Sequence, residues 1–242
     1  MMGGEKKKKQ KEKKNSLLIK ANKKGRHIMH ALNFFRVILY PWNAFFYPYK
    51  MHGYTKVGTG AYIYIGNHFS MWDIFYPART TWEGIHFFAK DSLMHAPVIG
   101  YFAKKIRALG VVRDGSDART LMDALRILKN GEKISLFPEG TRNRLSEEEF
   151  LPFRGGAALL AIKTKTPVIP FVICTKPKVF RKTHVVFGEP MELSQYYDRK
   201  LTQDDYAQAD EMLRNKLYEL RENFRAEQQA NKDKKKKRKC KS

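Results

Sequence analysis

From residue 61 onward, short apolar runs alternate with helical patterns, and this alternation limits the possible folds more than any other feature of the chain. The apolar runs, each typical of a buried strand, are residues 61–65, 85–89, 109–113, 133–137, 167–173 and 183–188. A long polar pattern over about 202–230 predicts a closing helix. Because strands that alternate with helices favour a parallel sheet, we expect a single α/β domain with a largely parallel central sheet flanked by helices.

Two of the helical patterns have recognisable ends. Residues 116–129 place leucines on one face, Ser116 or Asp117 can cap the start, and Gly131 follows the end. Residues 155–165, which read GGAALLAIKTK, form the second pattern. In open α/β sheets, active sites gather where strands end and helices begin. Functional residues are therefore expected in the turns that follow the strands.

The positive charge of the chain is concentrated at its two ends. The formal net charge is +23, of which residues 1–26 carry +9 and residues 232–242 carry +7, which leaves +7 for the 205 residues between them. Both ends lack the apolar residues that stabilise packing, so we expect two disordered basic tails. Such tails can bind an anionic membrane or nucleic acid, and the alternative is that they only keep the protein soluble.

The chain has two cysteines, Cys174 and Cys240. They are too few for a disulfide framework or a cysteine-based metal site. Cys174 follows the apolar run VIPFVI and is expected to be a buried thiol. This cysteine usage fits a reducing cytoplasm.

Residues 27–50 form an apolar segment that Pro41 divides. The 13 residues 28–40 would span only about 20 Å as a helix, against about 30 Å for the hydrocarbon core of a membrane. Aromatic residues of the kind found at a headgroup boundary follow the proline: Trp42, Phe45, Phe46, Tyr47 and Tyr49. We expect one or two short helices that lie in one leaflet, before a domain over 51–231. The alternative is a helix packed on the core of the domain.

A histidine and an aspartate follow the first strand-like run. Residues 61–73 read AYIYIGNHFSMWD, so His68 lies in the turn after the strand and Asp73 in the first turn of the next helix. The carboxylate can hydrogen-bond one ring nitrogen, leave the other as an acceptor and stabilise the imidazolium. This is the base half of a Ser-His-Asp arrangement without its serine. The alternative is that Asp73 only caps the helix beside a surface histidine; the other histidines form no spaced cluster that would favour a metal site.

A second polar turn follows the run at 133–137. Residues 138–142 read PEGTR. Gly140 permits a close approach of the backbone to a ligand, Thr141 offers a hydroxyl, and Arg142 offers a fork suited to phosphate. The Gly-Lys-Ser/Thr of a P-loop is missing, so no nucleotide site is expected. The alternative is an ordinary strand-to-helix loop.

The two polar turns occur in a specific order and spacing. Asn67-His68-x4-Asp73 is followed about 65 residues later by FPEGTR at 137–142. This combination resembles the glycerophospholipid acyltransferase family, and within it the bacterial 1-acyl-sn-glycerol-3-phosphate acyltransferases. The resemblance covers about residues 55–190.

Three further blocks are similar to the family pattern: residues 90–100 followed by Arg113 in GVVRD, residues 153–156 (FRGG) and residues 167–170 (PVIP). Two positions depart from it. Arg107 stands where a glycine is common, and Arg154 replaces the usual lysine, which keeps the charge but changes the geometry.

The resemblance implies a reaction and a role for each residue. His68, oriented by Asp73, would take the proton from the sn-2 hydroxyl of lysophosphatidic acid, and that oxygen would attack an acyl thioester to give phosphatidic acid. Asn67 would shape the loop, and backbone amides near Gly140 are candidates for binding the developing oxyanion. The residues that match the block that binds phosphate and glycerol are Glu139, Gly140, Thr141 and Arg142, with Arg113 as a further phosphate candidate.

The resemblance also implies the partners. The acyl donor would be an acyl-carrier protein or acyl-CoA, on an anionic membrane surface at the cytoplasmic face of the cell membrane. No cofactor, metal ion or nucleic acid is expected. An acyltransferase for glycerol 3-phosphate or another lysophospholipid would use the same motifs. A different class of function, a non-catalytic membrane- or nucleic-acid-binding protein that acts through its lysine-rich tails, is the remaining alternative.

Overall fold

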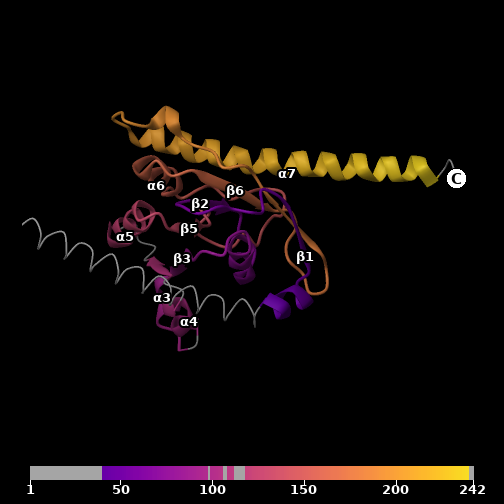
Figure 1. Ribbon diagram of the computed structural model, residues 1–242, viewed down its shortest axis with the longest axis horizontal. Helices are drawn as coiled ribbons and strands as arrows, with labels where there is room; N and C mark the ends of the chain where they lie inside the picture. The colour runs from indigo at the N-terminus through magenta and orange to yellow at the C-terminus, as the bar shows by residue number, and fades with distance from the viewer. Residues whose placement is uncertain (1–39, 98, 106–107, 112–117, 240–242) are drawn as a thin grey trace, which may run out of the picture.

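A seven-stranded sheet lies at the centre of the molecule (Figure 1). The computed structural model describes residues 40–97, 99–105, 108–111 and 118–239. The strands are β1 (Tyr49–Gly53), β2 (Ile63–Gly66), β3 (Ile85–Lys90), β4 (Leu109–Val111), β5 (Lys133–Leu136), β6 (Val168–Ile173) and β7 (Thr183–Phe187). The helical elements are residues 40–46, η1 (Met71–Ile74), α2 (Phe75–Ala78), α3 (Asp91–Met94), α4 (Ile99–Lys105), α5 (Ala118–Lys129), α6 (Ala157–Thr164), η2 (Ser194–Tyr196) and α7 (Gln203–Lys239).

The sheet confirms the expected largely parallel arrangement. Its strand order is β1-β7-β6-β2-β5-β3-β4, and each neighbouring pair is parallel except β6 and β7. β2 is central, with Ile65 opposite Leu136 of β5 and Pro170 of β6. Parallel strands with both faces covered are almost continuously apolar. Accordingly, every residue of β2 and β6 is buried.

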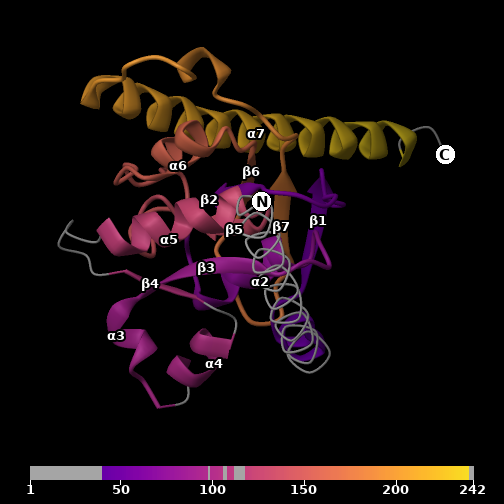
Figure 2. The same ribbon diagram turned by 60° about the vertical axis from the view of Figure 1, so that its left-hand side comes forward.

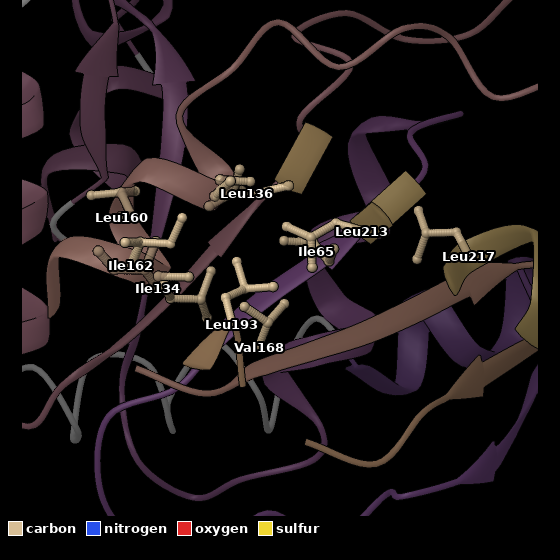
Figure 3. Close-up of a cluster of buried hydrophobic side chains, with 14 of the residues drawn as sticks. Ile65, Ile134, Leu136, Leu160, Ile162, Val168, Leu193, Leu213 and Leu217 are labelled. Atoms are coloured by element: carbon tan, nitrogen blue, oxygen red, sulfur yellow. The ribbon is translucent and has the colours of Figure 1, made fainter. Parts of the chain in front are cut away.

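Successive residues of β2 supply two hydrophobic cores, one on each face of the sheet. Ile63 and Ile65 belong to the core that α5, α6 and α7 cover, and Tyr64 belongs to the other core together with Phe171 and Tyr76. Figure 1 shows α5, α6 and α7 together on one side of the sheet, and Figure 3 shows aliphatic side chains from β2, β5, α6 and α7 meeting there. The helices thus fix the sheet from one face, and the turns after the strands remain free for function.

Helix α7 takes part in two capping interactions, one at its own start and one at the start of α6, which local sequence alone reveals only in part. Thr202 Oγ1 accepts a hydrogen bond from the Asp205 backbone N–H (3.2 Å), and the Asp205 carboxylate accepts one from the Thr202 N–H (2.8 Å). This reciprocal capping box starts the helix. Further along, the Asp210 carboxylate accepts a hydrogen bond from the Ala158 N–H (3.0 Å) in the first turn of α6, where Gly156 at the N-cap has no side chain to do so.

Helix α7 is also longer than the sequence pattern predicts. It was expected to end near residue 230, with residues 232–242 disordered, but it continues to Lys239. The expected disorder is therefore wrong for residues 232–239. Lysine and arginine are good helix formers, and extending a packed helix costs less free energy than nucleating a new one. Figure 2 shows this end of α7 running past the edge of the sheet.

Strand β1 was not expected. Residues 49 and 50, assigned from the sequence to the apolar segment 27–50, lie in this edge strand, which pairs in parallel with β7. The sequence of β1, YKMHG, is short and mixed in polarity, so its pairing depends on the neighbouring strand and not on a local pattern.

Two expected features lie wholly or mostly outside the described residues. These are the basic tail at 1–26 and residues 27–39 of the apolar segment. The described end of that segment, residues 40–46, is helical. Among the residues that the structure describes, none of the helices combines the length and apolar character that crossing a membrane requires.

Truncating the side chain of Leu213 is expected to destabilise the domain, whereas removing the end of α7 is not. Leu213 is fully buried between α7 and the sheet, so Leu213→Ala leaves a cavity and should lower the free energy of unfolding by about 2–5 kcal/mol. Residues 231–234 are exposed, and deletion of residues 232–242 should leave the unfolding midpoint unchanged. Urea denaturation of both variants tests this, and an equal loss in both would show that the end of α7 is part of the stable core.

Candidate active site

The two polar turns meet because they follow neighbouring parallel strands. His68 comes two residues after the end of β2, and the PEGTR turn comes directly after Phe137 at the end of β5. β2 and β5 are hydrogen-bonded side by side. The backbone N–H of Asn143 donates a hydrogen bond of 2.6 Å to the carbonyl oxygen of His68, which ties the two loops together. Motifs about 65 residues apart in the sequence therefore form one site.

The side chains of His68 and Asp73 are hydrogen-bonded as expected. His68 Nδ1 lies 2.8 Å from Asp73 Oδ2. A carboxylate only accepts hydrogen bonds, so Nδ1 carries the proton and Nε2 is left as an acceptor. The histidine side chain is 19% exposed, whereas that of Asp73 is completely buried. The ring can therefore be reached from outside while its partner is shielded from water.

Asp73 also caps the helical turn that contains it. Its Oδ2 accepts hydrogen bonds from the backbone N–H groups of Phe69 (2.7 Å) and Ser70 (2.6 Å), and Ser70 Oγ accepts one from the N–H of Trp72. The capping role and the role as partner of His68 are thus combined in one carboxylate. Burial raises the pKa of Asp73, while the hydrogen bonds from His68 and the two amides act in the opposite direction.

The ring of His68 is held from a second side by Phe137, a contact that the sequence motif did not predict. The two rings are stacked with centroids 4.1 Å apart and planes 12° apart. Phe137 in turn packs edge-on against Phe171 of β6 at 6.0 Å. The stack and the hydrogen bond to Asp73 together restrict the ring to one orientation.

Asn67 has the loop-shaping role that was expected of it. Its side-chain amide is 1% exposed and makes two hydrogen bonds to the backbone of Ile173, the last residue of β6. Asn67 Nδ2 donates to the Ile173 carbonyl oxygen (3.1 Å), and Asn67 Oδ1 accepts from the Ile173 N–H (2.8 Å). The side chain therefore continues the pairing of β2 with β6 where the backbone of β2 turns away.

Gly140 is required at its position by both conformation and space. The Gly140 N–H donates to the Phe137 carbonyl oxygen (2.9 Å) and closes a tight turn with Pro138 in its second position. The φ angle of Gly140 is +66°, and a Cβ atom built there would lie 2.8 Å from Cδ of Arg154. The Arg154 N–H also donates to the Pro138 carbonyl oxygen (2.9 Å). The FRGG block thus packs directly on the PEGTR turn.

Glu139 is the most perturbed titratable group of this turn. Its side chain is buried, and burial raises its pKa to about 8. The backbone N–H groups of His68 and Leu151 face the carboxyl group without reaching normal hydrogen-bond geometry, so they only partly oppose this effect. At neutral pH the carboxyl group therefore holds a proton and can donate a hydrogen bond. A strongly perturbed acid beside a histidine is typical of a functional site.

The remaining predicted residues divide into two groups. Thr141 is half-buried and Arg142 is exposed, and these last two residues of the turn directly precede Asn143, whose N–H bonds to His68. Arg113 and Arg107 lie outside the described residues. The expected site at 139–142 is thus brought to His68, while the place of Arg113 stays a prediction.

Asn143 is a site residue that sequence reasoning missed. It is 2% exposed, and its Oδ1 accepts hydrogen bonds from the N–H groups of Leu145 and Ser146 (both 3.1 Å). Its Nδ2 donates to the carbonyl oxygen of Glu149 (2.7 Å). Asparagine followed by a polar turn is a typical sequence signal for this Asx-type arrangement. Asn143 folds the loop that carries its own N–H to His68.

Neither a cluster of metal-binding side chains nor an activated thiol lies among the described residues. The described residues contain no group of three or more His, Cys, Asp or Glu side chains that could hold a metal ion. Cys174 is a buried free thiol, as expected, and burial raises its pKa to about 12. A thiol with such a pKa is a poor nucleophile at neutral pH.

Glu139→Gln should make the stability of the protein less dependent on pH. The folded-state pKa of Glu139 is about 8, above its ordinary value of 4.5, so the folded state binds the proton more tightly and stability falls as pH rises from about 4.5 to about 8. Glutamine copies the protonated shape and does not titrate. Between pH 5 and pH 8, the wild type should lose at least about 1 kcal/mol more than the variant in denaturant unfolding. Parallel pH profiles would contradict the raised pKa.

Asn67→Ala should destabilise the loop that carries His68. The variant leaves the buried N–H and carbonyl groups of Ile173 without partners, which costs about 1–3 kcal/mol for each group. Asn130→Ala, at an exposed asparagine after α5, is the matched control and should change stability by less than about 0.5 kcal/mol. Equal unfolding midpoints for the two variants would mean that the Asn67 amide is dispensable.

Comparison with known proteins agrees with this geometry. The family model described as Acyltransferase matches residues 48–174, slightly more than half of the chain. A 1-acyl-sn-glycerol-3-phosphate acyltransferase of Saccharomyces cerevisiae is 33% identical over 144 residues, which are 57% of this chain and 47% of the yeast protein. One of Bacillus subtilis is 31% identical over 117 residues, 46% of this chain and 57% of the bacterial protein. The chain spans about half the length of these curated relatives.

A solved structure shares the fold. The crystal structure of the 1-acyl-sn-glycerophosphate (LPA) acyltransferase PlsC from Thermotoga maritima superimposes with a TM-score of 0.61, at 22% identity, over 83% of this chain and 82% of that one. The match confirms the α/β class expected from the sequence. On the strength of the family model and its motifs, the chain belongs to the acyltransferase family.

Proposed function

We propose that the chain transfers an acyl group from a thioester to the sn-2 hydroxyl of 1-acyl-glycerol 3-phosphate and so makes phosphatidic acid. The observation that carries this proposal is the His68–Asp73 pair, joined through Asn143 to the turn that holds Glu139. Relatives from yeast and Bacillus subtilis that are 31–33% identical over the matched residues are named 1-acyl-sn-glycerol-3-phosphate acyltransferases. The geometry supports His68 as the base and Asp73 as the partner that stabilises its protonated form, with hydrogen-bond donors in the neighbouring PEGTR turn.

In this reaction His68 acts as the general base. Nε2 takes the proton of the sn-2 hydroxyl as its oxygen forms a bond to the thioester carbonyl carbon. Asp73 stabilises the resulting imidazolium through the hydrogen bond to Nδ1. The carbon–sulfur bond then breaks, and the departing thiolate receives the proton that His68 holds. Protons and charges balance without a covalent enzyme intermediate, and a base of this kind contributes about 10²–10⁴-fold to a rate.

The PEGTR turn binds the acceptor in this proposal. Thr141 and the Arg142 guanidinium supply donors for the phosphate, and Arg113 is a further candidate for the same group. Glu139 is buried, and in its protonated form it adds no negative charge near the phosphate. The side chain of Arg154 passes next to Gly140, so its positive charge also lies near this turn.

An anionic membrane surface is the proposed site of action, because the acceptor and the product are both lipids. The basic ends of the chain favour an anionic leaflet, and the apolar segment 27–50 favours contact with the boundary between headgroups and acyl chains. We propose that the acyl transfer takes place at the cytoplasmic face of the cell membrane. The donor is acyl-CoA or an acyl-carrier protein, both of which present the acyl group as a thioester.

His68→Ala should lower acyl transfer at least about a hundredfold, because the variant has no base for the sn-2 hydroxyl. Transfer of a labelled acyl group to lysophosphatidic acid in detergent micelles measures this, with acyl-CoA and acyl-carrier protein as alternative donors. Asp73→Asn should lose about tenfold or more while keeping the shape of the pair. His86→Gln, at the opposite end of the sheet, is the control and should keep the wild-type rate.

The outcomes separate the proposal from its alternatives. Full activity of His68→Ala would remove His68 from the mechanism. Acylation of glycerol 3-phosphate in preference to lysophosphatidic acid would keep the chemistry and change the substrate. Absence of transfer to any acceptor, from either donor, would favour a binding protein without catalysis.

A further inference from the structure

Large apolar side chains gather on the surface where helix 40–46 meets the loop between β6 and β7. Trp42, Phe45, Val179 and Phe180 are 63%, 68%, 49% and 64% exposed. Both segments are visible side by side in Figure 1, where the indigo helix lies against the orange loop. We call these four residues and Phe46 the aromatic surface. Exposed patches of this kind on a folded domain mark sites of interaction.

Ring contacts and a backbone hydrogen bond hold the residues of the aromatic surface together. Trp42 stacks on Phe46 at 5.2 Å. Phe180 contacts Phe45 and Phe46, with ring centroids 5.8 and 5.7 Å away. The Phe180 N–H donates a 2.7 Å hydrogen bond to the carbonyl oxygen of Phe46. Two segments more than 130 residues apart in the sequence are thus held together, while the side chains of Trp42, Phe45 and Phe180 stay mostly exposed.

The loop holds Phe180 in a backbone conformation that a bulky residue rarely adopts. The Arg181 N–H donates to the Lys178 carbonyl oxygen (3.1 Å), which closes a tight turn with Val179 and Phe180 at its tip. The φ angle of Phe180 is +57°, in the left-handed region that favours glycine or asparagine. The strain is not offset by burial, because the side chain is mostly exposed.

The charge around the aromatic surface identifies the class of partner. Residues 40–52 and 174–188 contain no Asp or Glu. Lys50, Lys178, Arg181 and Lys182 are all exposed. Aromatic side chains that settle at the headgroup boundary, surrounded by cations, match an anionic bilayer. A symmetric contact with a second copy of the chain would instead bring these like charges together.

The aromatic surface is continuous with the proposed active site. Trp72 packs on Tyr47 with ring centroids 5.8 Å apart. Trp72 also lines a small apolar pocket with Trp42, Phe46 and Val179. The next residue along the chain is Asp73, the partner of His68. The aromatic surface is therefore connected through Trp72 to the helical turn that carries Asp73.

We propose that the tip of the β6–β7 loop, Lys178 to Arg181, is a membrane-docking wedge that inserts Val179 and Phe180 at the headgroup boundary of an anionic bilayer, alongside Trp42 and Phe45. The proposal deepens the proposed function and rests on it for the presence of a membrane. It adds the β6–β7 loop of the α/β domain to the membrane contact expected from the apolar segment 27–50.

Phe180→Asn in the full chain tests the wedge. Sedimentation with vesicles of phosphatidylcholine and phosphatidylglycerol should show partitioning at least about fivefold weaker than wild type, because the variant lacks the ring that the bilayer buries in this proposal. The thermal midpoint should stay the same or rise, since asparagine tolerates the left-handed conformation. Met122→Gln, which removes an exposed apolar side chain on α5, is the matched control and should bind as wild type. Unchanged vesicle binding by Phe180→Asn overturns the proposal.

A charge variant and an activity assay complete the test. Lys178→Gln with Arg181→Gln should weaken binding to anionic vesicles by about fivefold for each charge and leave the weak binding to pure phosphatidylcholine unchanged. Phe180→Asn should keep the wild-type rate of acyl transfer in detergent micelles. If the wild type transfers no acyl group in micelles but still binds vesicles in a way that depends on Phe180, the proposed function alone is rejected. A dimer in sedimentation equilibrium that Phe180→Asn dissolves would assign the surface to self-association and overturn the wedge.

Discussion

The site depends on the parallel pairing of β2 with its two neighbours. Pairing with β5 brings the turn after Phe137 to His68, and the hydrogen bond from the Asn143 N–H to the His68 carbonyl oxygen keeps the two loops together. On the other side, Asn67 continues the pairing with β6 through its bonds to Ile173. The carboxyl ends of parallel strands form one edge, so residues distant in sequence converge there. The helices on one face, packed through α7, hold that edge in place.

Two buried carboxyl groups at this edge differ in the hydrogen bonds that they receive. Asp73 receives three hydrogen bonds on one oxygen, from the His68 ring and two backbone amides, and these favour its charged form. Glu139 has no comparable donors, and burial keeps its proton on up to a pH of about 8. Burial raises the pKa of both groups, and at Asp73 this effect is opposed by the donors that the folded turn presents. The difference comes from backbone amides that only the folded turns present.

A large part of this organisation could be predicted from the sequence. Six of the strands lie within a few residues of their apolar runs, because a strand buried on both faces needs such a run. The spacing of His68 and Asp73 is short enough for one turn to close their hydrogen bond. β1, the extension of α7 to Lys239 and the capping of α6 by Asp210 were not predicted. The pairing of β1 and the capping of α6 depend on neighbours that are distant along the chain, whereas the extension of α7 continues an already packed helix.

The sequence by itself determined the class of fold, the histidine, its aspartate and the glycine turn, because these follow from local pattern and local geometry. Only the tertiary structure decided the rest of the site. It stacked Phe137 on His68, joined the loops through Asn143, and buried Glu139. It also seated Phe180 on Phe46. The physical reason is that burial, stacking and loop closure depend on which strands become neighbours, and that choice is made by the packing of the whole sheet.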